Sequence, residues 1–171
     1  MQWHRGNVFL IGLMGAGKTT FGRWLAASLD KPFIDGDEEL ERRLGRTIPA
    51  IFEKEGEIFF RDCEQALLTE LVRREGIVLG TGGGVVLREA NREQLRINGT
   101  VIYLHATPDV LAKRLRGTTS RPLLQAAEDP VARLKELYEI RDPLYRQTAH
   151  CVIESTPEAV ARLVAAAEDN G

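Results

Sequence analysis

The stretch Gly12-Leu13-Met14-Gly15-Ala16-Gly17-Lys18-Thr19 reads G-x-x-x-x-G-K-T, and it decides the fold expected for this chain. Residues 7–11 before it form a short apolar run typical of a buried strand, and residues 20–29 after it have the apolar spacing of a helix. A glycine-rich loop in this setting turns several backbone N–H groups toward one anion, and the helix N-terminus adds partial positive charge. The sequence therefore predicts a phosphate-binding loop rather than a Gly-rich turn that ends in Lys-Thr by chance.

The loop also indicates which ligand it binds. The Lys18 side chain is long enough to reach the β- and γ-phosphates of a nucleoside triphosphate, and the Thr19 hydroxyl is suited to Mg²⁺. We therefore expect ATP as the co-substrate and Mg²⁺ as the cofactor. The candidate nucleotide-binding residues of this motif are Gly15, Ala16, Gly17, Lys18, Thr19 and Thr20.

The composition of the 171 residues is ordinary for one soluble globular domain. Hydrophobic residues make up 43% and charged residues 28%, and the net charge of -2 provides no electrostatic footprint for nucleic acid. No apolar run is long enough to cross a bilayer. We therefore expect a single cytoplasmic domain, residues 1–171, without a nucleic-acid or membrane partner.

The cysteines and histidines give no sign of a metal centre. Cys63 and Cys151 are far apart and lie in no metal-ligand spacing, so they are interpreted as two reduced thiols. The three histidines have neither metal spacing nor a triad partner in the sequence, so we expect surface or structural roles for His4, His105 and His150.

Short apolar strands alternate with helical patterns along the whole chain. Strands are predicted at 7–11, 32–35, 77–79, 100–104 and 151–153. Helices are predicted at 20–29, 37–44, 47–55, 57–74, from 107, from 129 to about 141, and from 156. This alternation predicts a three-layer α/β/α sandwich around a five-stranded, mostly parallel sheet. The long connection without clear periodicity, residues 117–128, is predicted to be a mobile lid.

Two aspartates follow the second predicted strand, with one glycine between them. In parallel sheets ligands bind beyond the carboxyl ends of the strands, which places Asp35 and Asp37 on the same edge as the phosphate loop. Transfer of a phosphoryl group to an alcohol needs an acceptor for the alcohol proton and a site for Mg²⁺, and two carboxylates could divide these tasks. The alternative is that Asp37 only caps the following helix.

A run of three glycines and several arginines complete the candidate groups. Gly82-Gly83-Gly84 follows the third strand and either makes a tight turn or lets the backbone approach a ligand closely. Arg61, Arg121 and Arg141 lie outside the phosphate loop, and Arg121 belongs to the predicted lid. An arginine on a mobile loop is suited to neutralising a transferring phosphoryl group, and paired arginines are suited to a carboxylate. The residue pattern alone does not choose among the arginines.

Several ordered motifs together carry a family resemblance. They are Gly12 to Thr19, Phe33-Ile34-Asp35-Gly36-Asp37, Gly56-Glu57 with Phe60-Arg61-Asp62-Cys63-Glu64, Thr81-Gly82-Gly83-Gly84, Ser120-Arg121-Pro122-Leu123-Leu124 and Arg141-Asp142-Pro143-Leu144-Tyr145. With these motifs the chain resembles, nearly end to end, the shikimate kinases of the nucleoside-monophosphate-kinase structural class. The resemblance implies ATP-dependent phosphorylation of the 3-hydroxyl of shikimate, in a monomer whose helices at about 37–64 bind the substrate.

The resemblance also implies roles on the shikimate side of the site. Asp37 would contact the acceptor hydroxyl and serve as the base. Arg61 and Arg141 would bind the shikimate carboxylate, and Gly83 and Gly84 would approach the ring hydroxyls.

On the nucleotide side the resemblance implies that Asp35 supports Mg²⁺, largely through water, together with Thr19. Arg121 would come from the lid to the γ-phosphate and, with Asp37 and Lys18, act in catalysis. Arg114 aligns with a position that stacks on adenine. One departure concerns Glu154-Ser155-Thr156-Pro157, where the family usually has an aspartate and a different loop around the adenine.

Two other classes of function remain as alternatives. One is another small-molecule kinase, such as a gluconate kinase or a nucleotide kinase; the ordered motif set is not expected in the former, and no second base-binding site is evident for the latter. The other is a non-catalytic nucleotide-binding homologue. Asp37, Arg61 and Arg121 argue against it, because a pure binder needs no groups on the acceptor side.

Overall fold

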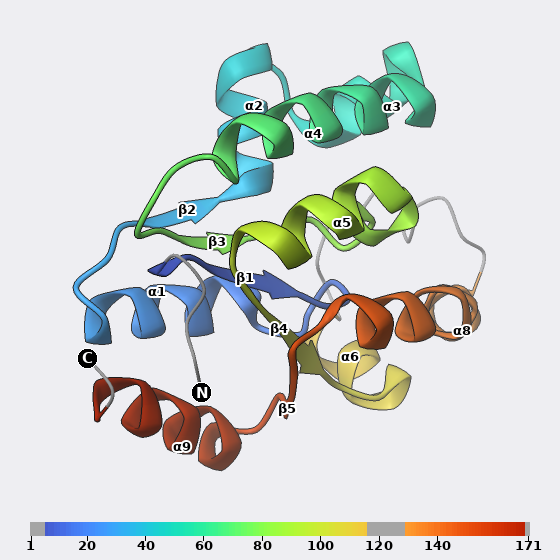
Figure 1. Ribbon diagram of the computed structural model, residues 1–171. Coiled ribbons are helices and arrows are strands. Elements are labelled where there is room, and N and C mark those ends of the chain that lie inside the picture. The colour runs from blue at the N-terminus through green and yellow to red at the C-terminus, as the bar shows by residue number, and fades with distance from the viewer. Residues whose placement is uncertain (1–5, 116–128, 170–171) are drawn as a thin grey trace.

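A five-stranded parallel sheet forms the centre of the computed structural model, which describes residues 6–115 and 129–169 (Figure 1). Its strands lie in the order β2-β3-β1-β4-β5. All four neighbouring pairs are parallel, with β1 between β3 and β4. The strands are β1 (Val8–Ile11), β2 (Phe33–Asp35), β3 (Val78–Gly80), β4 (Thr100–His105) and β5 (Cys151–Glu154). The predicted five-stranded parallel sheet is therefore confirmed.

Helices cover both faces of this sheet. They are α1 (Lys18–Ser28), α2 (Gly36–Leu44), α3 (Ile48–Glu55), α4 (Glu57–Leu71), α5 (Glu89–Asn98), α6 (Pro108–Arg114), α8 (Pro130–Thr148) and α9 (Pro157–Glu168), with a short 3-10 turn η2 (Val85–Leu87). Helices α1 and α9 pack together on one face, and α5 and α8 pack together and against β4 on the other (Figure 1). Strand β1 is fully buried between these layers. In the described ranges no helix is both long and apolar enough to span a membrane.

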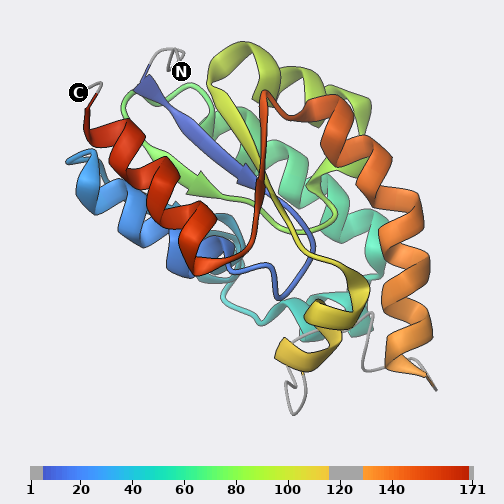
Figure 2. The same ribbon diagram turned by 90° about the horizontal axis from the view of Figure 1, so that it is seen from below.

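The carboxyl ends of the strands meet along one edge of the sheet. Parallel pairing in register places the end of β2 beside the end of β3, and the end of β3 beside that of β1. The loop after β1 and helix α6 both lie at this edge (Figure 2). The predicted phosphate loop, the two aspartates and the three glycines are therefore brought to the same side of the molecule, as ligand sites in parallel sheets require.

Two helical elements differ from the sequence prediction. Helix α5 and the turn η2 were not predicted, and helix α8 was predicted to end at about Arg141 but continues through Pro143 to Thr148. A proline inside a helix removes one backbone hydrogen bond, so a stop was expected. The helix continues because Tyr145 and Thr148 beyond the proline are fully buried, and this packing outweighs the lost hydrogen bond.

The start of α2 shows which of the two aspartates caps this helix. Asp35, not Asp37, is the N-cap, and its Oδ1 accepts a hydrogen bond from the Glu38 backbone N–H at 3.0 Å. The expectation that Asp37 could cap this helix is therefore wrong, because α2 begins one residue earlier than predicted, at Gly36. Asp37 then lies in the first turn, where it faces the adjacent cleft.

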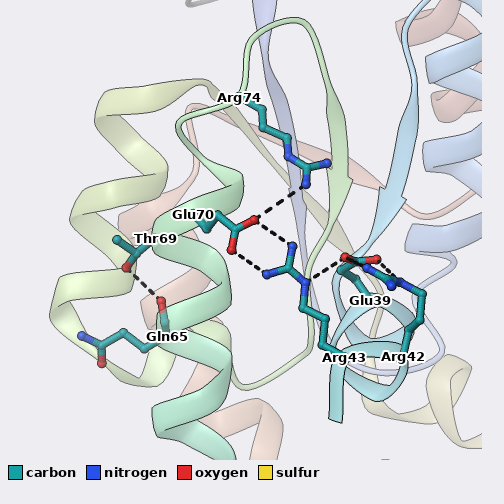
Figure 3. Close-up of polar contacts among 7 residues, drawn as sticks. All are labelled: Glu39, Arg42, Arg43, Gln65, Thr69, Glu70 and Arg74. Atoms are coloured by element: carbon teal, nitrogen blue, oxygen red, sulfur yellow. Dashed lines mark hydrogen bonds and ion pairs between the residues drawn. The ribbon is translucent and has the colours of Figure 1, made fainter. Parts of the chain in front are cut away.

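An ion-pair network ties α2 to α4, the two helices that carry Asp37 and Arg61 (Figure 3). Arg43 forms two hydrogen bonds with the Glu70 carboxylate, at 2.5 and 2.8 Å, and a third with Glu39 at 2.9 Å. Arg42 also pairs with Glu39, at 2.6 Å. The hydrogen bonds from Arg42 and Arg43 lower the pKa of Glu39 to about 2.

We expect Glu39→Gln to lower the urea midpoint of unfolding at pH 7 by roughly a few tenths of a molar, since exposed ion pairs contribute little. The depressed pKa means that this contribution is present above the ordinary pKa of 4.5 and is lost as pH falls toward about 2. The difference in urea midpoint between the parent protein and Glu39→Gln should therefore shrink below pH 4.5. Urea titrations of both proteins from pH 3 to pH 7 measure this difference.

Glu53→Gln is the matched control, because Glu53 is an exposed acid that forms no ion pair with any described residue. An unchanged midpoint at pH 7 for Glu39→Gln, or a difference that does not depend on pH, would contradict the stabilising role of the network.

Candidate active site

A cleft of about 730 Å³ opens at the carboxyl edge of the sheet. Its walls come from the loop after β1, the start of α1, helix α2, the start of α3, the turn after β3 and the end of α6. The predicted site residues that line it are Gly15, Gly17, Lys18, Thr19, Thr20, Asp35, Asp37, Gly83 and Arg114. The nucleotide motif and the acidic pair therefore share one cavity.

The phosphate loop has the conformation that its sequence predicts. Gly17 adopts φ = 90°, a left-handed conformation that a side chain would disfavour, and helix α1 begins at the next residue. No described side chain caps this helix, which leaves its positive end directed at the cleft. The Lys18 ammonium donates to the carbonyl oxygens of Gly12 and Leu13 within the loop. Ala16 is buried, so it contributes through its backbone.

Thr19 and Asp35 form the most direct candidate for a magnesium site. The Thr19 hydroxyl donates to Asp35 Oδ2 at 2.8 Å, so the two predicted metal-binding side chains touch. Both are hard oxygen donors, and Mg²⁺ in nucleotide sites is typically held by one or two such groups, water and the phosphates. Because both Asp35 oxygens already accept hydrogen bonds, one from Thr19 and one from the Glu38 backbone, the residues fit a metal that Asp35 contacts through water.

The glycine turn, Gly82-Gly83-Gly84 after β3, lies against the carboxylates of Asp37 and Glu64. A Cβ atom on Gly82 would lie 2.7 Å from Asp37 Oδ1 and 2.9 Å from Glu64 Oε2. Both distances are too short for a real side chain, so only glycine allows these two acids to come so close to the backbone. Burial raises the pKa of the Glu64 carboxyl, and the Arg61 guanidinium opposes this shift.

Arg61 is buried beneath the same turn. Its side chain donates to Glu64 Oε1 at 2.9 Å and reaches Glu57 at 3.4 Å, and its guanidinium lies 5.0 Å from the centre of the Phe60 ring. A Cβ on Gly84 would lie 2.3 Å from Arg61 Nη2. The guanidinium is thus pressed onto the Gly84 backbone, and its Nε has no hydrogen-bond partner among the described residues.

Arg141 approaches the turn from the opposite helix, α8. It is 3% exposed, and no carboxylate of the described residues forms an ion pair with it. Burial lowers the pKa of this guanidinium, an effect that the neighbouring Tyr145 hydroxyl opposes. A buried cation without a paired carboxylate is stabilised by an incoming anion, so this position favours an anionic ligand.

Gly83 lies between the phosphate loop and Arg141. The position of its missing Cβ lies 3.4 Å from Arg141 Nη1, 3.6 Å from the Met14 backbone nitrogen and 3.7 Å from the Gly12 carbonyl oxygen. The phosphate loop therefore packs on one side of this glycine and Arg141 on another. A small anion bound near Arg141 would lie beside the phosphates of a nucleotide held by the loop.

The rim of the cleft is closed by contacts from α6 and the chain after β5. Arg114 donates to the hydroxyl and carbonyl oxygens of Ser155, at 2.7 and 2.8 Å, and to the Gly15 carbonyl at 3.1 Å. Ser155 in turn donates to the Ala16 carbonyl at 2.6 Å. The chain after β5 is thus hydrogen-bonded directly to the phosphate loop.

One expectation about the histidines is refined by the structure. His105 is a structural residue, as predicted, but it has partners that the sequence did not reveal. Its Nδ1 lies 2.8 Å from a Glu154 carboxylate oxygen, and its Nε2 lies 2.6 Å from the Tyr138 hydroxyl. These contacts join the ends of β4 and β5 to helix α8.

Some predicted elements fall outside the described residues, and others were not foreseen. Arg121 and the predicted lid at 117–128 lie outside the described ranges. No role is predicted from the sequence for Glu64 or Tyr145, although the spacings of three from Arg61 and four from Arg141 place each on the same helical face as its arginine.

These observations define a class of protein. A phosphate loop and two aspartates share one cleft, and two buried arginines lie at the adjacent glycine turn, all within one parallel α/β sheet. This is the arrangement of a P-loop phosphotransferase acting on a small molecule.

Comparison with known proteins gives the family. The family described as Shikimate kinase matches residues 14–168. A shikimate kinase of Ralstonia nicotianae is 58% identical over 158 residues, which are 92% of this chain and 83% of that protein. One of Neisseria meningitidis serogroup C is 56% identical over 155 residues, 91% of each chain. The structure of the Acinetobacter baumannii shikimate kinase in complex with shikimate has a TM-score of 0.89 at 47% identity, and covers 94% of this chain and 89% of that one. The chain belongs to the shikimate kinase family.

Gly84→Ala tests the geometry of the glycine turn. The new Cβ would force the Arg61 guanidinium to move and would break its pair with Glu64, so we expect a loss of about 1–3 kcal/mol in unfolding free energy. Gly83→Ala is the comparison, since its Cβ would meet Arg141 at the tolerable distance of 3.4 Å. Chemical denaturation and crystal structures of both variants measure the effect. Equal stability of the two variants, with Arg61 in place, would contradict the close approach.

Proposed function

We propose that this chain transfers the γ-phosphoryl group of ATP to the 3-hydroxyl of shikimate, giving shikimate 3-phosphate and ADP, a step toward chorismate and the aromatic amino acids. The observation that carries the proposal is the glycine turn, where the phosphate loop, the acidic side chains and two buried arginines meet. Family membership and the likeness to a shikimate complex support it.

The proposed acceptor fits the charges around the turn. Shikimate is a small carboxylate with several ring hydroxyls. We assign its carboxylate to Arg61 and Arg141, whose guanidinium groups approach the turn from α4 and α8. The bidentate geometry of guanidinium suits a carboxylate. The backbone at Gly83 and Gly84 is assigned to the ring, because it lies between these cations and the phosphate loop.

Transfer then needs groups at the reacting oxygens. We assign to Asp37 the acceptance of the proton from the 3-hydroxyl as it attacks, because it lines the cleft beside the turn. Lys18 is assigned to the β- and γ-phosphates, where its ammonium neutralises developing charge. Arg121, outside the described residues, is assigned to the γ-phosphate. Mg²⁺, held by Thr19 and through water by Asp35, would neutralise phosphate charge and orient the triphosphate.

The remaining features of the proposal concern the whole protein. We propose that residues 1–171 act as a single domain with a lid at about 117–128, as a cytoplasmic monomer without nucleic-acid or membrane partners. The net charge of -2 provides no electrostatic footprint for nucleic acid. On the nucleotide side, Arg114 is assigned to the adenine, since it holds the rim formed by Ser155 and the phosphate loop.

Two rival functions make different demands on this site. A gluconate kinase would also phosphorylate a hydroxylated carboxylate, and a nucleotide kinase would need a second base-binding surface. A non-catalytic binder would have no use for Asp37 beside the acceptor pocket. Arg141 is buried and forms no ion pair with a carboxylate of the described residues, which favours a compact monoanionic acceptor over a nucleotide.

A direct assay separates these functions. The purified protein with ATP and Mg²⁺ should convert shikimate to shikimate 3-phosphate, identified by NMR, with a kcat/KM at least about a hundredfold above that for gluconate or nucleoside monophosphates. Turnover of either rival at an equal or higher rate would overturn the assignment. ATP binding without transfer to shikimate would identify the non-catalytic homologue.

Asp37→Asn tests the proposed base. We expect kcat to fall by roughly 10²- to 10⁴-fold while the Kd for ATP changes little, because the variant loses a proton acceptor and few nucleotide contacts. Glu38→Gln is the control, since Glu38 lines the same cleft and pairs with Arg23 only at 3.9 Å. Single-turnover kinetics and calorimetry give both quantities. A kcat for Asp37→Asn within threefold of the parent value would remove Asp37 from the chemistry.

A further inference from the structure

Tyr145 is a fully buried residue for which the mechanism above has no role. It lies in α8 four residues after Arg141, so both side chains lie on the same face of the helix. The ring of Tyr145 packs against that of Tyr103 in β4, with 4.9 Å between the ring centres. The packing explains why the ring is buried, but not why the buried residue carries a hydroxyl.

The hydroxyl of Tyr145 lies at the proposed carboxylate site. It donates a hydrogen bond to the carbonyl oxygen of Gly83. The Arg141 guanidinium lies beside the same glycine, with its Nη1 3.4 Å from the position of a Cβ on Gly83. The buried hydroxyl and the charged group of the site therefore both lie against the backbone of the glycine turn.

Arg141 has few other means of being held in place. Within the described ranges no carboxylate forms an ion pair with it, whereas Arg61 is held by Glu64 and Glu57. An arginine side chain left free in a cavity would have to lose considerable rotamer entropy when it binds a ligand. A fixed donor group avoids this loss and binds more tightly.

We propose that Tyr145 is a positioning residue for substrate binding, whose hydroxyl fixes the Arg141 guanidinium and the Gly83 carbonyl relative to each other for recognition of the acceptor's carboxylate. This inference rests on the proposed function, because it takes shikimate as the acceptor. The hydrogen bond of this hydroxyl goes to the glycine turn, and no hydrogen bond among the described residues joins it to the phosphate loop, so we expect it to act on the acceptor and not on ATP.

Tyr145→Phe removes only the hydroxyl and keeps the ring that packs on Tyr103. We expect the Kd and KM for shikimate to rise about tenfold, because the buried hydrogen bond that holds the Gly83 carbonyl beside the Arg141 guanidinium is lost. The KM for ATP should stay within twofold, and kcat within threefold. Calorimetry without nucleotide and steady-state kinetics measure these values.

Tyr103→Phe is the matched control. Tyr103 is equally buried in the same ring pair, but its hydroxyl donates to Asp142 at 2.7 Å and has no contact with the turn. A merely structural role for Tyr145 would make the two variants alike in melting temperature and in shikimate affinity. We expect similar losses of melting temperature and a loss of affinity in Tyr145→Phe only.

A second ligand tests whether the effect acts through the carboxylate. Methyl shikimate has the same ring but no negative charge, so its Kd should be nearly the same for the parent protein and for Tyr145→Phe. In an Arg141→Ala background, adding Tyr145→Phe should cause no further loss of shikimate affinity.

Three results would overturn the inference: an unchanged shikimate Kd in Tyr145→Phe, an equal loss in Tyr103→Phe, or an equal loss for the methyl ester. Failure of the proposed function is a separate result, because the parent protein would then fail to phosphorylate shikimate at all.

Discussion

The close approach of side chains to the backbone at Gly82, Gly83 and Gly84 is the constraint on which the site depends. Asp37, Arg141 and Arg61 each approach one of these three glycines, at positions that a Cβ would occupy or crowd. The middle glycine also touches the phosphate loop. In the proposed reaction this turn would set the spacing between the phosphoryl donor and the acceptor, which transfer requires to be short and fixed.

Most of the fold could be predicted because its elements have clear apolar periods or capping residues. The five strands and helices such as α4 and α9 were found in this way, to within a few residues at each end. Helix α5 has only one buried apolar residue, Leu95, so its pattern gave little signal. The end of α8 was misjudged because Pro143 is a local stop signal, whereas the burial of Tyr145 is a tertiary effect that sequence spacing does not show.

The candidate site, like the fold, has residues that the sequence predicts and residues that it does not. The phosphate loop was predictable because all its groups lie in one short segment, and Asp35 and Asp37 because they follow a strand end. The residue pattern did not choose among the arginines, although Arg61 follows the aromatic pair Phe59-Phe60, and their roles were assigned through the family resemblance. Asp35 caps α2 because the helix starts at Gly36, one residue before its predicted start, and the burial of Arg61 and Arg141 depends on packing between elements that local spacing does not show.

The glycine turn also bears on how this protein could be inhibited. A compound seated over residues 82–84 would meet main-chain atoms, which mutation does not remove, and a side chain added at Gly82 or Gly84 would displace Asp37, Glu64 or Arg61. Resistance mutations at these two glycines would therefore disturb the site itself, whereas a compound that relied on the Ser155 hydroxyl at the outer rim would lose its contact through one substitution there.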